Sequence, residues 1–540
     1  MFFVVTIVTL LAAPVGMAQG HLPQLGDGQE MSVAAERQLG QRIAREIYRD
    51  PDYIDDPVLM DYVQRIWQPL LQAARARGDI PPELADRFAW QVMLARDRSV
   101  NAFALPGAYL GLHLGLIAIV GNRDELASVL AHELSHVTQR HIARMTTQQN
   151  QQTPWLLGAT ILGALAARKN TDIANAVLIG SQAASAQTQL NFSRDMEREA
   201  DRIGYQVLHD AQFNVQGFVG MFDKLAQASR INDNGSFPYL RTHPLTSERM
   251  GDMQSRVQQG ISTPVPAAMP NSVVRGLRVA ADDVAIEHAI MATRARLLSD
   301  PAPETLRAEL AQARSVAASR ANEGARVSVK AIGQLYGGAL AALKLRELAS
   351  ASGLAALAAG TLNLDADTAA VPTYQAQAAI TILASEIALA QGKAQQVLAL
   401  LQPYLPLNPS ASTATRPFAR SALLLWAQAT NGPDTSVAQK ISVLERLQTW
   451  VALQPQDTLA WEALAAAYMA QNQPLRAIRA QAEARVTVLD YAAALDRFKA
   501  GQAMAQQSGQ TDHIERSIID ARARTVQGQL RELHTDKPGN

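Results

Sequence analysis

The pentapeptide His132-Glu133-Leu134-Ser135-His136 constrains this 540-residue chain more than any other feature of its sequence. Apolar residues around it recur at helical spacing, and Asn122 followed by Glu125 has the form of a capping box, so the segment is predicted to be a helix. On a helix, residues i and i+4 share one face, so both imidazoles can reach one Zn²⁺ at roughly 2.0 to 2.1 Å. Glu133 then points about 100° round the helix, where a general base can take a proton from water that the metal activates.

The alternative is a chance match on an ordinary helix, which is improbable because only 10 residues are histidine. A catalytic zinc site normally takes three protein ligands, so a third must lie elsewhere. In the charged stretch 191–204, Glu197 and Asp201 share one face of a predicted helix, and Glu199 lies nearly opposite. Glu197 is the expected third ligand, and Asp201 is placed to hydrogen-bond the far nitrogen of His132. The competing interpretation is a solvated helix with charge pairs at i and i+4.

Three segments together resemble the zinc metallopeptidases related to CAAX prenyl proteases and the heat-shock protease HtpX. They are the zinc motif, the Glu197-x-x-x-Asp201 element and Asn101-Ala102-Phe103-Ala104-Leu105-Pro106-Gly107. Within this family, the chain most resembles the soluble periplasmic type that has a helical-repeat tail. The resemblance runs from about residue 31 to residue 259 by motif, and to the C-terminus by architecture.

The resemblance implies a zincin-like α+β metallopeptidase domain with a small β-sheet at residues 31–259. It also implies one Zn²⁺ per chain, with His132, His136 and Glu197 as ligands, Glu133 as the base and Asp201 as a supporting partner.

His243, in Thr242-His243-Pro244-Leu245, has two interpretations. From the residues alone, a histidine before a proline in a loop is expected to be exposed or to cap a helix. The resemblance implies instead that His243 can approach the zinc, take the position of substrate or water and hold the enzyme latent. Of the other nearby histidines, His113 is predicted to be packed in an apolar stretch. His141, about 140° round the helix from His136, is predicted to face solvent.

Two segments before the zinc helix predict a small sheet. Residues 88–95 are rich in strand formers, and Pro106-Gly107 is typical of a turn that leads into a strand at 108–112. An exposed edge of this sheet near the metal could receive a substrate backbone as an added strand. The alternative is that the strands only close the core.

Composition and the N-terminus bear on location. Lys plus Arg and Asp plus Glu both number 49, so nothing recommends nucleic acid or an anionic membrane as the main partner. The apolar run at residues 1–13, with small residues after it, predicts a signal peptide at 1–18 that is too short to span a membrane. No Lys or Arg precedes Phe2, which departs from the usual pattern. Together with the resemblance, the signal indicates the periplasm.

Between the two zinc elements, residues 155–186 are mostly apolar or alanine-rich. The apolar run is shorter than the roughly 20 residues that a spanning helix needs. One interpretation is a buried pair of helices. The other is a mobile flap that covers the zinc cleft or makes peripheral contact with a membrane or a partner.

The second half is predicted to be an α-solenoid. A proline-rich linker at 260–271 precedes a helical repeat domain at 272–540. Small and aromatic residues at 461–484 have the spacing of a tetratricopeptide repeat, although Gln481 replaces the expected aromatic residue. Weaker helix pairs around 336–348, 377–401 and 422–451 are expected to be divergent copies. The solenoid offers either a groove for proteins or only a packing platform.

The resulting hypothesis is a mainly α periplasmic zinc endopeptidase that cleaves misfolded or stalled outer-membrane proteins. The repeats would recruit unfolded or partly assembled proteins, or the outer-membrane assembly machinery. The alternative is a chaperone or scaffold for envelope protein assembly whose zinc site is latent.

Overall fold

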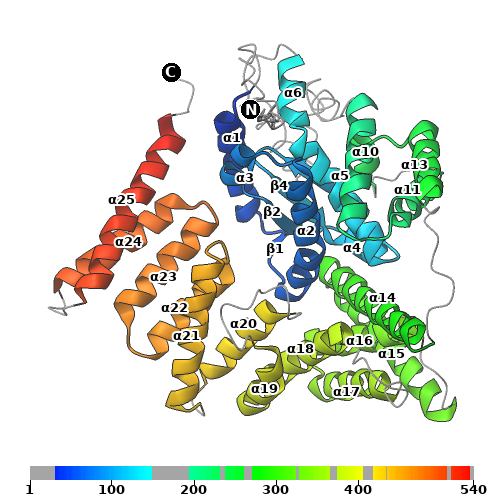
Figure 1. Ribbon diagram of the computed structural model, residues 1–540. Coiled ribbons are helices and arrows are strands. Elements are labelled where there is room, and N and C mark those ends of the chain that lie inside the picture. Colours follow the sequence, from blue (N-terminus) through cyan, green and yellow to red (C-terminus); the bar gives the residue numbers. More distant parts are fainter. Residues whose placement is uncertain are drawn as a thin grey trace, which may run out of the picture.

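The computed structural model describes residues 31–148, 194–230, 237–260, 271–323, 328–364, 374–405, 418–432, 435–507 and 512–535. It shows a small mixed sheet among helices, followed by a long array of helices (Figure 1). The mainly α fold class, with an α+β domain ahead of helical repeats, is confirmed. The predicted signal peptide at 1–18, the segment 155–186 and nearly all of the linker 260–271 lie outside the described residues.

The sheet has the strand order β1 (Tyr53–Ile54), β2 (Gln91–Ala95), β4 (Tyr109–His113) and β3 (Ala102–Leu105). β2 and β4 are parallel, with Gln91 opposite Tyr109, and the other pairs are antiparallel. Gly107, at φ +72°, supplies the backbone conformation for the predicted turn between β3 and β4. β3 is the last strand in this order, so it lies at one edge of the sheet. There it packs beside the helix that carries the zinc motif.

The helices of the first part surround this sheet. The zinc motif lies on α5, whose residues are buried from Glu125 to Thr138. Asn122 caps α5 by accepting a hydrogen bond from the backbone of Glu125 at 2.9 Å. The Glu125 side chain accepts hydrogen bonds in return from the backbone of Gly121 and from the side-chain amide of Asn122. The helices are α1 (Val33–Arg49), α2 (Pro57–Arg77), α3 (Pro82–Arg87), α4 (Leu114–Ile119), α5 (Arg123–Thr138), α6 (His141–Gln148), α10 (Arg194–Asp210), α11 (Gln216–Arg230), α12 (Tyr239–Thr242) and α13 (Ser247–Gly260).

The described residues of the second part form consecutive helices. The predicted repeat at 461–484 corresponds to α22 and α23, which pack against each other, and the weaker pairs correspond to α16 to α21. None of the helices in the described ranges is long and apolar enough to cross a membrane. The array comprises α14 (Asn271–Ser299), α15 (Pro303–Glu323), α16 (Val329–Lys344), α17 (Leu348–Leu364), α18 (Tyr374–Ala390), α19 (Ala394–Leu401), η2 (Gln402–Tyr404), α20 (Ala419–Thr430), α21 (Val437–Leu453), α22 (Thr458–Ala470), α23 (Pro474–Thr487), α24 (Tyr491–Gln507) and α25 (His513–Thr535).

The array is docked on the first part through α4, which packs against α14, and through α2, which packs against both α14 and α20 (Figure 1). Two neighbouring aspartates just before α2 each pair with an arginine of the array, of which Arg294 is buried and Arg420 half-buried. Asp56 lies 2.7 Å from Arg294 of α14, and Asp55 lies 2.7 Å from Arg420 of α20. Moving the repeats away from the sheet would separate both pairs, and separating the buried Asp56–Arg294 pair is costly because it leaves an uncompensated charge.

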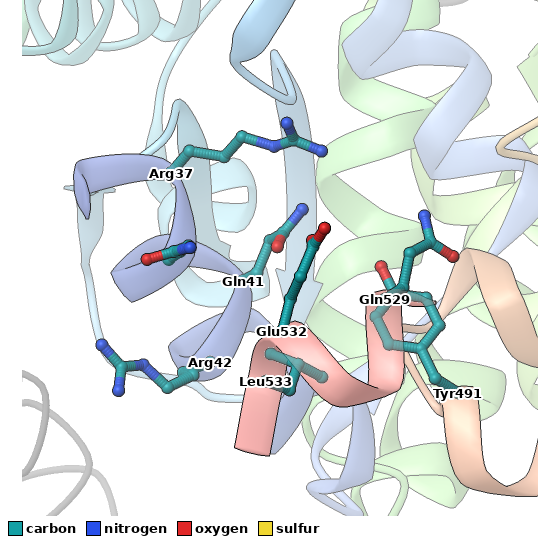
Figure 2. A pocket seen from close by; sticks show the side chains of 8 residues that line it. Arg37, Gln41, Arg42, Tyr491, Gln529, Glu532 and Leu533 are labelled. Carbon is teal, nitrogen blue, oxygen red and sulfur yellow. The ribbon is translucent and has the colours of Figure 1, made fainter. Parts of the chain in front are cut away.

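The C-terminal helix also returns to the first part. Figure 2 shows Arg37 and Gln41 of α1 near Glu532 and Gln529 of α25, which together line a crevice of about 20 Å³. Such a volume holds about one or two water molecules. None of the residues expected at the zinc site lines this crevice.

Candidate metal centre

α5 presents both histidines of the zinc motif to the same point. His132 and His136 are buried, and their Nε2 atoms lie 3.0 Å apart. α10 crosses α5 here and brings in Glu197, whose carboxylate oxygens lie 3.5 Å from His132 Nε2 and 3.4 Å from His136 Nε2. The crossing is close because α10 has Gly204 at the contact, where a Cβ atom would lie 3.1 Å from the carbonyl oxygen of Ala131.

The spacing of these donors suits a zinc ion. Tetrahedral ligands at 2.0 to 2.1 Å from Zn²⁺ lie roughly 3.3 to 3.4 Å from one another. The two Nε2 atoms lie 3.0 Å apart, and the Glu197 oxygens Oε2 and Oε1 lie 3.5 Å from His132 and 3.4 Å from His136 respectively. Two imidazoles and one carboxylate are also a donor set that catalytic zinc sites use. The residues therefore fit the metal in both chemistry and separation.

His243 lies at the same point, although the loop sequence alone favours exposure. It follows α12 directly and is only 1% exposed, with its ring stacked on Tyr239 at a centroid distance of 4.6 Å. Its Nδ1 atom lies 3.3 Å from His132 Nε2 and 3.0 Å from Glu197 Oε1. These separations match those of a fourth tetrahedral donor, so His243 lies where a water or substrate oxygen would bind.

Glu133 is fully buried beside these residues. Neither of its carboxylate oxygens makes a hydrogen bond with the described residues, and Oε1 lies 3.4 Å from His243 Nε2. A buried carboxylate without hydrogen bonds is costly, because its hydration is lost without replacement. Such a group suits a site that receives a polar reactant.

Asp201 and Arg249 contact the expected metal ligands His132 and Glu197. Asp201 Oδ1 lies 3.0 Å from His132 Nδ1, which is the nitrogen that faces away from Glu197. Arg249 of α13 donates two hydrogen bonds to Asp201, at 2.6 and 2.8 Å, and its Nη1 lies 2.7 Å from Glu197. The sequence alone does not reveal the role of Arg249, because one arginine in an amphipathic helix gives no sign that it is buried between two carboxylates of another helix.

The predicted exposure of His141 is wrong. The prediction assumed that one helix continues past His136, but α5 ends at Thr138 and α6 begins at His141. His141 is fully buried, with Nδ1 2.8 Å from Nδ1 of His136, and burial lowers its pKa to about 4. His113 is buried as expected and lies 2.9 Å from Ser99, outside the cluster.

Burial and neighbouring charges shift the pKa values of the residues in this cluster. Burial alone would lower the pKa of His132, but hydrogen bonds and charge interactions with Asp201 and Glu197 outweigh it and raise the pKa to about 9. Burial lowers the pKa of His136 well below its ordinary value. Burial would raise the pKa of Glu197, but the charge of His243 and hydrogen bonds from the histidines hold it well below the ordinary value. A deprotonated carboxylate and a neutral imidazole are the forms that bind metal.

Comparison with known proteins gives an independent view of this region. Residues 60–257 match the sequence profile of peptidase family M48. The chain is 33% identical over 241 residues to a putative beta-barrel assembly-enhancing protease of Vibrio cholerae, covering 44% of this chain and 48% of that protein. It is 32% identical over 240 residues to the beta-barrel assembly-enhancing protease of Escherichia coli, covering 44% and 47%.

A more distant relative is the mitochondrial metalloendopeptidase OMA1 of Saccharomyces cerevisiae, which is 29% identical over 199 residues, covering 35% of this chain and 54% of that protein. The chain spans about half the length of the curated relatives it matches. The matched profile contains α5, α10 and His243, which together form the cluster of metal donors. Residues 60–257 of this chain are therefore a peptidase family M48 metallopeptidase domain.

Proposed function

We propose that the chain is a zinc-dependent endopeptidase of the bacterial periplasm. The observation that carries the proposal is the convergence of three donors at zinc spacing beside a buried carboxylate, Glu133, that makes no hydrogen bond with the described residues. His132, His136 and Glu197 would hold one zinc ion. The predicted signal peptide and the resemblance to periplasmic metallopeptidases support the location.

Zinc would supply a Lewis acid that lowers the pKa of a water and polarises the carbonyl of the scissile bond. Glu133 would accept the proton of the attacking water and pass it to the leaving nitrogen, because its carboxylate is otherwise uncommitted. Asp201 would hold the orientation of His132 through Nδ1, and Arg249 would balance the charge of Asp201 and Glu197.

The edge strand β3 would position the substrate. It lies at the end of the sheet and packs beside α5, so an extended peptide added to β3 would run close to the metal donors. Main-chain hydrogen bonds to an edge strand require little sequence specificity, which suits an enzyme that acts on unfolded chains.

The relatives named as beta-barrel assembly-enhancing proteases support misfolded or stalled outer-membrane proteins as substrates. We assign recruitment of these substrates, or of the assembly machinery, to the helix pairs α16 to α25, which we take as divergent tetratricopeptide repeats.

Metal analysis and proteolysis of the full-length chain test this proposal. The purified protein should contain about one zinc per chain. In the His243→Ala background, Glu133→Gln should lower casein hydrolysis by about 100-fold or more while zinc is retained. Glu248→Gln on the exposed face of α13 is the matched control. Undiminished hydrolysis by Glu133→Gln would refute the catalytic assignment.

The second candidate is a chaperone or scaffold with a latent zinc centre, and the position of His243 favours it. It would replace the first candidate if zinc-loaded His243→Ala cleaved no unfolded protein while the chain still prevented aggregation of an unfolded outer-membrane β-barrel protein.

A further inference from the structure

The polypeptide makes a sharp break between α5 and α6. α5 ends at Thr138, Arg140 adopts the left-handed conformation at φ +50°, and α6 begins at His141. This conformation is uncommon for a residue with a side chain, so surrounding contacts must hold it. Arg140 is held by the buried Glu36 of α1, at 3.0 Å, and by the backbone oxygen of Met31.

The consequence of the break is a direct contact between two imidazoles. Had the helix continued, His141 would point about 140° away from His136. Instead Nδ1 of His141 lies 2.8 Å from Nδ1 of His136, and the ring centroids lie 4.9 Å apart with the planes at 75°. The contact is made by the nitrogen of His136 that faces away from Glu197.

The proton arrangement at this contact follows from the role of His136. If Nε2 of His136 binds a metal, the proton of the neutral ring is on Nδ1, and Nδ1 must donate it. His141 Nδ1 then accepts, so the proton of His141 is on Nε2. That atom lies 3.1 Å from Glu199, whose carboxylate is also held by Arg144 at 2.9 Å. Each donor in this series of hydrogen bonds, from His136 through His141 to Glu199, therefore has an acceptor.

We propose that His141 and Glu199 form a positioning pair for the metal ligand His136. This inference rests on one part of the proposed function, which is that His136 is a metal ligand. The two metal-binding histidines are then both oriented by carboxylates of α10, although by different routes. Asp201 reaches His132 directly at 3.0 Å, and Glu199 reaches His136 through the ring of His141. Such partners fix the tautomer and the ring orientation, and their loss typically costs about 10- to 100-fold in metal affinity.

The test measures metal binding rather than proteolysis. In full-length protein, His141→Leu should weaken zinc binding about 10- to 100-fold in competition with a chelator. It should also change the visible absorption of the Co²⁺-substituted protein, because His136 is no longer fixed. His141→Gln should restore both, because its amide can accept from His136 and donate to Glu199. His113→Leu is the matched control, which removes another buried histidine and should leave both readouts unchanged.

A second variant keeps the test decisive if His141→Leu does not fold. Glu199 is about one-quarter exposed, at 27%, so Glu199→Ala should fold. It should weaken zinc binding and change the Co²⁺ absorption less than His141→Leu does. Wild-type zinc affinity and an unchanged spectrum in Glu199→Ala and in a folded His141→Leu would overturn the inference. Absence of metal binding by wild-type protein would instead refute the proposed function.

Discussion

Nε2 of His243 lies 3.4 Å from Oε1 of Glu133, and both side chains are buried. The other ring nitrogen of His243 lies 3.0 Å from the expected ligand Glu197. His243 therefore bridges the expected base and the expected metal site, in the space that a scissile carbonyl needs. In the proposed reaction, the substrate and His243 would compete for the same position in this conformation.

Replacement of His243 by alanine should raise proteolysis of unfolded casein. The competing ring would be absent, so the gain should lie between about fivefold and 150-fold, the usual range of a coupling free energy between two states. Initial rates on zinc-loaded protein measure it, with the exposed His209→Ala as control. A decrease in rate would show that His243 assists the reaction rather than blocking it.

Replacement of Arg249 by alanine should destabilise the protein. Arg249 is 6% exposed and pairs with both Asp201 and Glu197, so its removal takes away the cation that contacts both buried carboxylates. Breaking a buried pair in this way costs about 3 to 5 kcal/mol. Urea unfolding of the metal-free protein measures the change. Arg198→Ala, which removes an exposed arginine from α10, should have a much smaller effect.

The same substitution separates two roles of Arg249. If the guanidinium only balances charge, added zinc should recover most of the lost stability, because the metal supplies positive charge beside Glu197. Lack of recovery by zinc would show that the two hydrogen bonds to Asp201 are needed to shape the site.

Zinc affinity should rise with pH. In metal-free protein, interactions with Asp201 and Glu197 raise the pKa of His132 from 6.5 to about 9, so a proton must leave before Nε2 can bind metal. Below about pH 9, each unit of acidification should weaken zinc binding about tenfold.

The stability of the metal-free protein should have the opposite pH dependence and fall as the pH rises. The contribution of protonated His132 is complete below pH 6.5 and is lost as the pH rises through about 9.

Chelator competition at several pH values and calorimetric proton release measure this dependence. Asp201→Asn removes the charge beside Nδ1 of His132 and should move the transition to lower pH. Proton release near pH 7 that is the same in this variant and in wild type would contradict the assignment to His132.

The part of the site that lies within one helix could be predicted from the sequence. The spacing of His132 and His136, and the cap at Asn122, depend only on the helical period and on local hydrogen bonds. Glu197 and Asp201 required the further step of placing two carboxylates on one face of a second helix. The helix pair α22 and α23 was predicted for the same reason, since the pattern of its packed residues repeats locally.

The remaining features depend on contacts between distant segments. His141 was misplaced because the left-handed conformation of Arg140 has no sequence signal and is held by Glu36, 104 residues away. The strand β1 has two residues and is defined by its pairing with β2. Arg249 has its role only once α13 is packed against α10. No local pattern encodes these relationships.

Replacement of Arg420 by alanine should uncouple the helical array from the metallopeptidase domain. Arg420 pairs with Asp55 before α2 and with Asp457 at the N-terminus of α22, so its loss leaves two half-buried carboxylates without their cation at the junction. The cost should be about 3 to 5 kcal/mol. Calorimetry of the full chain should show one unfolding transition in wild type and two in the variant. The partly exposed Arg314→Ala, within the array, is the control and should keep a single transition. A single, undisplaced transition in Arg420→Ala would show that the remaining contacts, which include the Asp56–Arg294 pair and the packing of α14 and α20 on the first part, are sufficient to hold the array in place.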